Sequence, residues 1–485
     1  MIAKLLGRTA GIALGMGLCA AACGARTPIP EKVTKGTTST TGTGGSGGTG
    51  GMTGTGGMTG TGGDGGVIST GGTGGTGGTG GTGGTVVQNP VVSEGADSFL
   101  QSETSTAVAP NGFVAVAWID IQAGGGSAIG YAISADDGKS FPVPSAVSSP
   151  GGRLASDPVI AVDAAGSFYV CWVGYFIDGA GMPSDMHIYV SKAPAGATTF
   201  GDPIEVSAPS GMDFLDKPWI TITNAGTILV TYAVFTNVSS KLVVARSQDG
   251  QSWQQSTMLE SASAFYNLAY PCAPKNGSRV YATYLTLTND VKASLTYSDD
   301  QGATWLPLVQ NVTVSLDGEL VAFTDPSCVA EGNEVWVTYG LTDEPLGENE
   351  ADTPRLTSIR AVRSSDLGKS FDLRLEAGDP KAAPFFLLPG LAREESGALD
   401  VVYYAGTMDE DDSGTYRRAR MVDPAAGFAP SVVVESPVTF LQARNDARWL
   451  GDYVGVATRA GRLYTSFVVN TDGTAHVAFA RPALP

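Results

Sequence analysis

The chain has 485 residues and a formal net charge of −18, with two histidines and five cysteines. The acidic balance disfavours nucleic acid and anionic membrane surfaces as partners. His187 and His476 are too few for a histidine-based zinc site. Cys171, Cys272 and Cys328 lie inside strand-like runs, so we expect buried thiols, with a bridge between Cys272 and Cys328 as the alternative.

Residues 1–23 are typical of a bacterial secretory signal: a basic start, a short apolar core at 12–18 and a small-residue end. That end, the sequence AAAC at 20–23, resembles a lipoprotein processing site in which Cys23 receives the lipid. The alternative is ordinary signal cleavage after Ala22, which would leave Cys23 as a free cysteine. We therefore expect an envelope protein, either an outer-membrane lipoprotein or a secreted protein, that touches the membrane only through its lipid anchor.

Residues 24–84 are expected to be a linker. From about residue 36 the chain is almost pure Gly and Thr, with no apolar face to bury, so the sequence predicts a disordered tether. A flexible segment of about 50 residues spans roughly 35–42 Å. Such a tether would hold a folded domain clear of the membrane.

Residues 85–485 are repetitive. A Gly turn, followed by alternating apolar residues and an aromatic, recurs seven times. The turns begin at Gly112, Gly166, Gly226, Gly277, Gly332, Gly397 and Gly461. Alternation with period two indicates half-buried strands, and we find no convincing amphipathic helix.

A second repeat is a turn with the pattern S-x-D-x-G-x-[ST]-[WF]. It occurs at residues 134–141, 298–305 and 364–371, and in a shorter form at 247–253. Ser and Asp side chains bond nearby backbone N–H groups in such turns, and Gly supplies a positive φ. These residues resemble the Asp-box (BNR) repeats of sialidase-like β-propellers, and the resemblance covers nearly all of residues 85–485.

The two repeats together predict an all-β propeller of four-stranded antiparallel blades. Each blade would have strands a, b, c and d in chain order. Seven a–b pairs can be counted, but the last blade lacks its own strand d. Residues 85–92 are expected to supply that strand and close the ring. The sequence therefore predicts seven blades; sialidases have six, so six is the alternative.

Acidic residues open several of the predicted a strands. Symmetry would place them in a ring near the axis, as ligand-binding residues: Glu103, Asp157, Asp216, Asp325 and Asp452. Such a ring is suited to Ca²⁺, the one cofactor we consider, or to paired acids for glycoside chemistry. The alternative is that these carboxylates only cap strands. Further acids in the b–c loops, including Asp185, are expected to be solvated.

The resemblance to sialidases also implies catalytic positions. Sialidases use an arginine triad, a Tyr nucleophile paired with Glu, and an Asp acid. Here Asp120 and Tyr453 stand near the acid and nucleophile positions, and Arg444 and Arg448 are candidate anion contacts. The first-blade arginine is missing, because Glu103 begins the matching stretch, and no Glu clearly partners Tyr453.

Two functions from different classes follow. The leading hypothesis is a surface-anchored, monomeric binding propeller that recognises a glycan or another extracellular ligand through its acidic loop face. The alternative is an exo-glycosidase of sialidase type with a diverged active site. A structural scaffold in the envelope is a third interpretation. The sequence leaves open whether the protein is an enzyme.

Overall fold

The structure is a computed structural model. It describes residues 89–93, 98–122, 125–208, 213–343, 354–406, 413–439, 449–470 and 474–482. The predicted signal with Cys23, the predicted tether, and Arg444 and Arg448 lie outside these residues. Within the described ranges no helix is long and apolar enough to cross a bilayer.

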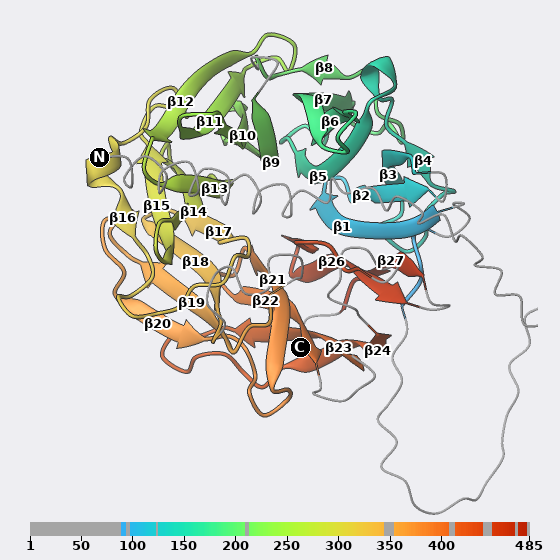
Figure 1. The fold of residues 1–485 in the computed structure, drawn as a ribbon. Helices are drawn as coiled ribbons and strands as arrows, with labels where there is room; N and C mark the ends of the chain where they lie inside the picture. The colour runs from blue at the N-terminus through green and yellow to red at the C-terminus, as the bar shows by residue number, and fades with distance from the viewer. Residues whose placement is uncertain are drawn as a thin grey trace, which may run out of the picture. The chain divides into compact units, whose positions relative to one another are not determined.

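The described residues form seven antiparallel sheets arranged in a ring (Figure 1). Blade 1 contains β1 (Ser98–Val108), β2 (Val114–Gln122), β3 (Ser127–Ser134) and β4 (Ser145–Ala146). Blade 2 contains β5 (Leu154–Val162), β6 (Phe168–Ile177), β7 (Pro183–Ala193) and β8 (Ile204–Glu205). Blade 3 contains β9 (Phe214–Ile222), β10 (Ile228–Phe235), β11 (Ser240–Ser247) and β12 (Gln254–Ser261).

The remaining blades repeat this order. Blade 4 contains β13 (Phe265–Cys272), β14 (Val280–Leu287), β15 (Val291–Ser298) and β16 (Val312–Thr313). Blade 5 contains β17 (Cys328–Glu331), β18 (Glu334–Leu341), β19 (Ser358–Ser364) and β20 (Leu373–Glu376). Blade 6 contains β21 (Phe385–Arg393), β22 (Leu399–Gly406), β23 (Ser413–Met421) and β24 (Val432–Thr439). Blade 7 contains β25 (Gly455–Arg459), β26 (Arg462–Asn470) and β27 (Ala475–Ala480). Two short 3-10 helices, η1 (Pro150–Gly152) and η2 (Leu308–Gln310), lie in connections.

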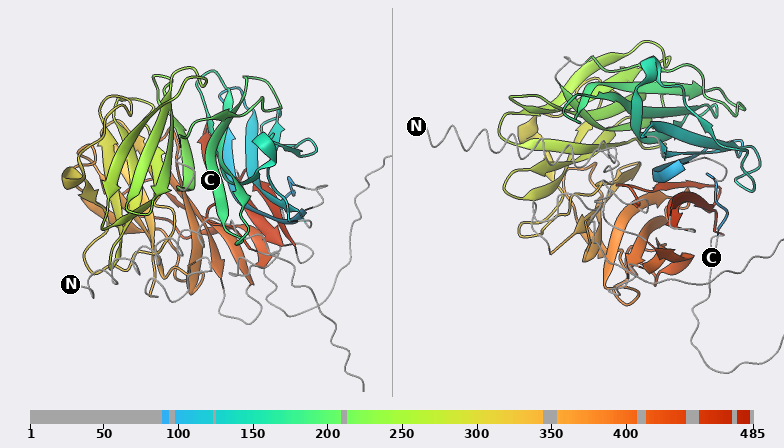
Figure 2. Two further views of the ribbon diagram at one scale, coloured as in Figure 1. Left: turned by 45° about the horizontal axis from the view of Figure 1, so that its top comes forward. Right: turned by 45° about the vertical axis from the view of Figure 1, so that its right-hand side comes forward.

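Each sheet keeps chain order, so the first strand of a blade is innermost and the last is outermost (Figures 1 and 2). The a–b and c–d turns share one end of the ring, which we call the turn face. The b–c and d–a connections share the other, which we call the loop face. The prediction of an all-β, seven-bladed propeller is confirmed, and the six-bladed alternative is not realised.

The N-terminal segment closes the ring, as predicted. Val91 bridges Ala478 in β27, and the Val92 N–H donates to the Val477 carbonyl at 2.7 Å. The Phe479 N–H donates to the Pro90 carbonyl at 3.1 Å. The first and last parts of the propeller are thus joined within blade 7, and the outer edge of β27 does not stay unpaired.

The core is built between neighbouring sheets. The aromatic residue that ends each Gly-turn repeat is at most 2 % exposed, and these seven residues are Trp118, Trp172, Tyr232, Tyr284, Tyr339, Tyr404 and Phe467. All lie on the second strand of a blade, where both faces of the sheet are covered by neighbouring blades. The repeated aromatic position is therefore explained by packing.

The S-x-D-x-G turns are held by their own side chains. In blade 4 the Ser298 hydroxyl oxygen accepts the Gly302 N–H at 2.8 Å. Asp300 accepts the Thr304 N–H at 2.8 Å and the Thr304 hydroxyl at 2.6 Å. Gly302 has a φ of +81°, a conformation that glycine adopts without a steric cost. The turns of blades 1 and 5 repeat these bonds, so this pattern positions strands c and d.

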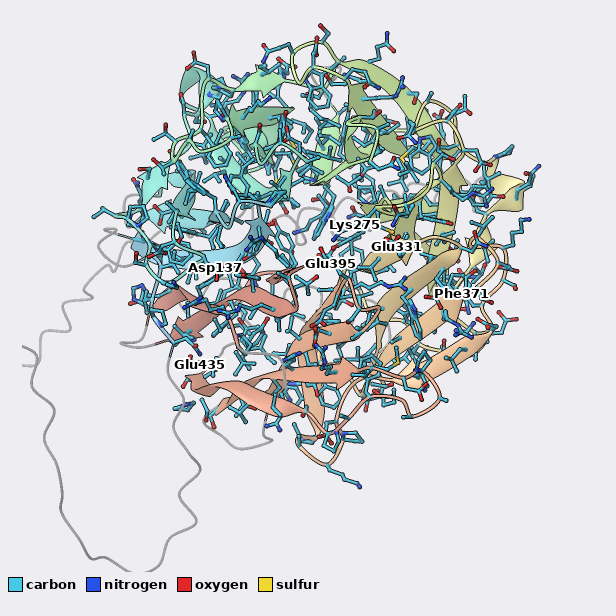
Figure 3. The ribbon with its side chains drawn as sticks, turned by 180° about the vertical axis from the view of Figure 1, so that it is seen from behind. Asp137, Lys275, Glu331, Phe371, Glu395 and Glu435 are labelled. Carbon is cyan, nitrogen blue, oxygen red and sulfur yellow. A yellow bond between two sulfur atoms is a disulfide. The ribbon has the colours of Figure 1, made fainter. Side chains whose placement is uncertain are left out.

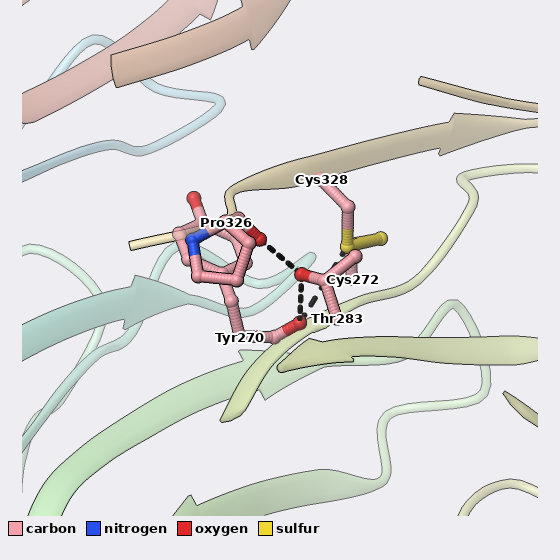
Figure 4. The surroundings of a disulfide bond; sticks show 5 residues. All are labelled: Tyr270, Cys272, Thr283, Pro326 and Cys328. Atoms are coloured by element: carbon pink, nitrogen blue, oxygen red, sulfur yellow. Dashed lines mark hydrogen bonds between the residues drawn. A yellow bond between two sulfur atoms is a disulfide. The ribbon is translucent and has the colours of Figure 1, made fainter. Parts of the chain in front are cut away.

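One expectation about cysteine is wrong. Cys272 at the end of β13 and Cys328 at the start of β17 form a disulfide with a Cα–Cα distance of 5.8 Å, instead of two buried thiols (Figure 4). They are 56 residues apart in sequence, about one repeat, so they fall on neighbouring innermost strands. Cys171 is a buried free thiol, as expected.

Candidate functional site

The innermost strands share an irregularity that points side chains toward the axis. In β1, β5, β9, β13 and β21 the pairing register shifts, which marks a β-bulge. One residue at each bulge has a positive φ of 47–56°, and these residues are Glu103, Asp157, Lys217, Leu268 and Leu388. A bulge leaves one residue outside the ladder and re-aims its side chain. The bulges of β1, β5 and β9 place Glu103, Asp157 and Lys217 next to one another.

Lys217 joins carboxylates from three other blades. Its Nζ lies 3.0 Å from Glu103 Oε1, 2.6 Å from Asp157 Oδ1 and 2.7 Å from Asp452 Oδ2. The side chains of Lys217, Glu103 and Asp157 are at most 1 % exposed, and that of Asp452 is 15 % exposed. Glu103 and Asp452 accept hydrogen bonds from the ammonium, and Asp157 Oδ1 lies within ion-pair distance of it. We call these four residues the axial cluster.

Burial and charge set the protonation of this region. Burial raises the pKa of Glu103 well above its usual value, although Lys217 opposes this shift. Burial likewise raises the pKa of Asp325 to about 8. Burial alone would lower the pKa of Lys217, but Asp157, Asp452 and Glu103 together raise it well above 10.5. Burial therefore favours the neutral form of Glu103 and Asp325, and the surrounding carboxylates keep Lys217 charged.

The five predicted ligand-binding acids lie at or near the axis in different settings. Glu103, Asp157 and Asp452 meet on Lys217. Asp325 is buried within electrostatic reach of them. Asp216 accepts a hydrogen bond from Asn267 Nδ2 at 2.7 Å.

These acids do not surround an open channel, because most are sealed from solvent and a lysine occupies the centre. Within the described ranges no group of His, Cys, Asp or Glu side chains is arranged to hold a metal ion. The axial carboxylates therefore do not fit Ca²⁺, since their oxygens already face the Lys217 ammonium.

Lys217 was not among the predicted ligand-binding residues, although the sequence carries a signal for it. Asp216, one residue earlier, was predicted as the ring member of blade 3. Proline follows the bulge residue in three innermost segments, Asp157-Pro158, Lys217-Pro218 and Leu388-Pro389, and the pair Asp325-Pro326 repeats this pattern in the sequence. Aligning the repeats on that proline places Lys217 in the ring and Asp216 beside it.

Tyr453 and Asp120, the two predicted catalytic residues that the structure describes, have separate hydrogen-bond partners. The Tyr453 hydroxyl donates to the Pro158 carbonyl at 3.1 Å, and the residue is 5 % exposed. Burial, followed by the charges of Glu103 and Asp157, raises its pKa well above 10, which disfavours the phenolate. Asp120 is half-buried at the loop-face end of β2 and accepts a hydrogen bond from the Ser98 hydroxyl. The catalytic roles of Tyr453 and Asp120 remain predictions.

An accessible polar and aromatic group lies on the loop face of blade 2. His187 Nδ1 is 2.7 Å from Glu205 Oε1, and His187 Nε2 is 3.0 Å from Asp185 Oδ1. Arg153 pairs with Asp185, and its guanidinium carbon lies 4.7 Å above the centre of the Phe176 ring. We call these five residues the blade 2 patch.

The blade 2 patch is ordered and still exposed to solvent. Asp185 is 50 % exposed and Glu205 42 % in their side chains, and Phe176 is 37 % exposed. The hydrogen bond from His187, and then the charge of Arg153, lower the pKa of Asp185. Asp185 was expected to be a solvated loop acid, and the sequence offered no signal that His187 and Arg153 would fix it.

Comparison with known proteins supports the fold and goes no further. No protein-family model and no curated protein matches the chain. A solved ulvan lyase of polysaccharide lyase family PL25 is 10 % identical, with a TM-score of 0.50 over 81 % of this chain and 93 % of that one. A protein of unknown function from Dyadobacter fermentans is 17 % identical (TM-score 0.48; 83 % and 99 % covered). The leech intramolecular trans-sialidase is 12 % identical (TM-score 0.42; 83 % and 70 % covered).

At these identities the similarity concerns the fold alone. The assignment of the S-x-D-x-G turns to Asp-box repeats remains a prediction from the sequence. The chain is a seven-bladed β-propeller, similar in fold to a solved polysaccharide lyase.

Proposed function

We propose that this protein is an exported propeller, anchored through Cys23, that binds a neutral glycan on its loop face without cleaving it. The observation that carries the proposal is the blade 2 patch, because it combines exposed carboxylates with an exposed aromatic ring. Carboxylate oxygens are acceptors for sugar hydroxyls, and an aromatic ring supplies an apolar contact surface. Ligand sites commonly have this composition: an apolar surface with a few fixed polar groups.

The patch is also preorganised. His187 is bonded on both ring nitrogens, Arg153 is bonded to Asp185, and Phe176 lies beneath the guanidinium. Side chains already held in one arrangement lose less conformational entropy when a ligand binds. The carboxylates of Asp185 and Glu205 leave free lone pairs that face solvent, so they are available to a ligand.

Charge favours a neutral ligand over sialic acid. Asp185 and Glu205 are the most exposed charged groups of the patch, and the chain as a whole has a net charge of −18. A carboxylate on the ligand would be repelled by this field. The ulvan lyase of similar fold acts on a polysaccharide, which supports carbohydrate as the ligand class.

The axial cluster argues against hydrolysis by a sialidase mechanism. The cation that meets the axial carboxylates is Lys217, not an arginine, and it is buried. The Tyr453 hydroxyl is bonded to a carbonyl and has a raised pKa, so it is a poor nucleophile. A diverged exo-glycosidase of sialidase type is the alternative, and a turnover assay separates the two.

Export is supported by cysteine chemistry. Disulfides persist in extracytoplasmic compartments and are rare in the reducing cytoplasm. The Cys272–Cys328 bridge is consistent with the signal segment predicted at the N-terminus. Globomycin treatment, which blocks lipoprotein signal cleavage, should leave an uncleaved precursor; processing that continues in its presence would contradict lipidation of Cys23.

The test is a binding assay on an array of neutral, acidic and amino-sugar oligosaccharides, paired with mass spectrometry of the recovered ligand. Phe176→Ala should weaken binding about tenfold, a loss of ~1.4 kcal/mol, because a central aromatic contact is removed. The matched control is Val238→Ala, which truncates an apolar side chain that is 72 % exposed in the b–c connection of blade 3. Equal binding by wild type and Phe176→Ala would refute the site. Release of a cleaved sugar would favour the alternative.

A further inference from the structure

A cavity of about 380 Å³ lies on the turn face where blade 7 meets blade 1. Its walls include Asn111, Asp137, Lys139, Arg459, Arg462 and Tyr464, and we call it the seam pocket. Asp137 is labelled in Figure 3, on the first S-x-D-x-G turn of the chain. The pocket lies at the other end of the blades from the blade 2 patch, so it is independent of the function proposed above.

Arginines from blade 7 surround Asp137. Arg481 Nη1 is 3.1 Å from Asp137 Oδ2, and Arg459 Nη1 is 3.3 Å from Asp137 Oδ1. Arg462 Nη1 is 3.7 Å from Oδ2. The Tyr464 hydroxyl donates to Oδ1 at 2.6 Å. One carboxylate thus faces three guanidinium groups, on a chain whose net charge is strongly negative.

The second carboxylate of the turn does not balance this charge. Asp136 accepts the hydroxyls of Ser134 and Ser140 and the N–H groups of Lys139 and Ser140. Its oxygens are therefore engaged within the turn, and within the described residues Asp136 forms no ion pair with the arginines. Four cationic side chains therefore share two carboxylates, which leaves an excess of two positive charges around the pocket.

Two of these cations have unused donors. Arg462 is 39 % exposed, and within the described residues its guanidinium makes only the long ion pair to Asp137. The Lys139 side chain is exposed at the rim, and its ammonium has no bonded partner in the described parts of the chain. These two groups are free to bond a ligand.

Other blade junctions show how much of this arrangement the fold requires. Asp137 corresponds to Gln301 in blade 4 and Leu367 in blade 5, since each precedes the turn glycine and has a φ of 60–67°. The Gln301 carbonyl accepts one bond from Arg246 of blade 3, and the Leu367 carbonyl accepts one from Arg279 of blade 4. One arginine is enough to tie a turn to the preceding blade. Two of the three arginines at the seam are therefore not required to hold the turn.

We propose that the seam pocket binds an oxyanion, the carboxylate or sulfate group of an acidic saccharide. The planar guanidinium fork of Arg462 fits two oxygens of such a group, and Lys139 supplies a second, point-like charge. Asn111 and Arg459 also line the pocket. The pocket admits one such group with its sugar ring, and its charge rejects cationic ligands.

The test is calorimetric titration of the exported protein with sodium sulfate, sodium glucuronate and glucose, at matched ionic strength. Sulfate or glucuronate should bind one per chain, more weakly as sodium chloride is added, and glucose should not bind at the seam. Whichever anion binds more tightly identifies the group. Arg462→Gln should weaken anion binding about tenfold or more, because a charge-assisted hydrogen bond is lost.

Control variants distinguish a loss of anion binding at the seam pocket from a loss of stability and from an effect on the loop face. Lys139→Gln should weaken anion binding, whereas Lys369→Gln, at the same turn position in blade 5, should not. Arg462→Gln should leave the unfolding temperature and neutral-glycan binding unchanged, and Phe176→Ala should leave anion binding unchanged. Absence of anion binding up to about 20 mM, which detects millimolar dissociation constants, would overturn the proposal. Equal anion binding by wild type and Arg462→Gln would also overturn it.

Discussion

Lys217→Met is the sharpest test of the axial cluster. Methionine keeps an unbranched, flexible side chain and removes the ammonium, with a thioether sulfur in place of one methylene. The change leaves Glu103, Asp157 and Asp452 buried without their shared cation. Removing one partner of a buried ion pair costs about 3–5 kcal/mol. Protein unfolding entropies imply that ~4 kcal/mol lowers the unfolding temperature of a domain of about 400 residues by roughly 5 °C.

The assay is thermal unfolding followed by calorimetry and near-ultraviolet circular dichroism at pH 7 and at pH 4.5. The loss in Lys217→Met should be smaller at the lower pH, because burial raises the pKa of Glu103 and a protonated Glu103 no longer needs the cation. Asp157→Asn in the same chain should recover part of the loss by removing one unpaired charge. The matched control is Lys292→Met, whose ion pair to Asp317 is 3.7 Å long and exposed, and which should change stability by less than about 0.5 kcal/mol. If Lys217→Met is as stable as Lys292→Met, the axial cluster does not hold the blades together.

Three further predictions concern stability. The pKa of Asp325 is about 8, above its unfolded value, so the wild-type free energy of unfolding should fall from pH 4 to pH 8 by up to ~1.4 kcal/mol per pH unit. Urea unfolding of Asp325→Asn should show a flatter dependence on pH. An unchanged dependence would exclude Asp325 as its source. The Cys272→Ala/Cys328→Ala variant should lose about 2–4 kcal/mol of unfolding free energy, because the bridge closes a loop of 56 residues. Wild type in reductant should lose a similar amount. A variant as stable as oxidised wild type would contradict this. Gly302→Ala should destabilise more than Gly196→Ala, because both residues have positive φ but a Cβ at Gly302 would lie 2.7 Å from Leu229; equal unfolding temperatures would show that the contact relaxes.

The fold could be predicted from the sequence because its structural unit is repeated. Glycine turns, period-two alternation and the S-x-D-x-G turns recur at regular spacing, and each reports a local geometry that the structure repeats in successive blades. Ring closure by the segment before residue 93 was also predictable, because the last blade lacked an outer strand. The disulfide was predicted less well, because buried thiols and a bridge have the same sequence pattern at Cys272 and Cys328.

The sites were less predictable because they depend on details that alternation does not encode. A bulge moves the axial position by one residue, which is why Asp216 was chosen in place of Lys217. The seam pocket joins Asp137 to Arg459 across 322 residues, and only ring closure brings them together. The blade 2 patch depends on side-chain contacts of Arg153, which follows η1, with residues of β6 and β7, and no motif exists for these contacts.

The central claim is that the loop face binds a glycan while the sealed axis performs no hydrolysis. The most direct measurement is mass spectrometry of a bound neutral oligosaccharide, recovered after prolonged incubation with stoichiometric wild-type protein, Phe176→Ala and Tyr453→Phe. Wild type and Tyr453→Phe should retain the ligand intact, and Phe176→Ala should retain little. Recovery of cleaved products from wild type, but not from Tyr453→Phe, would contradict the account.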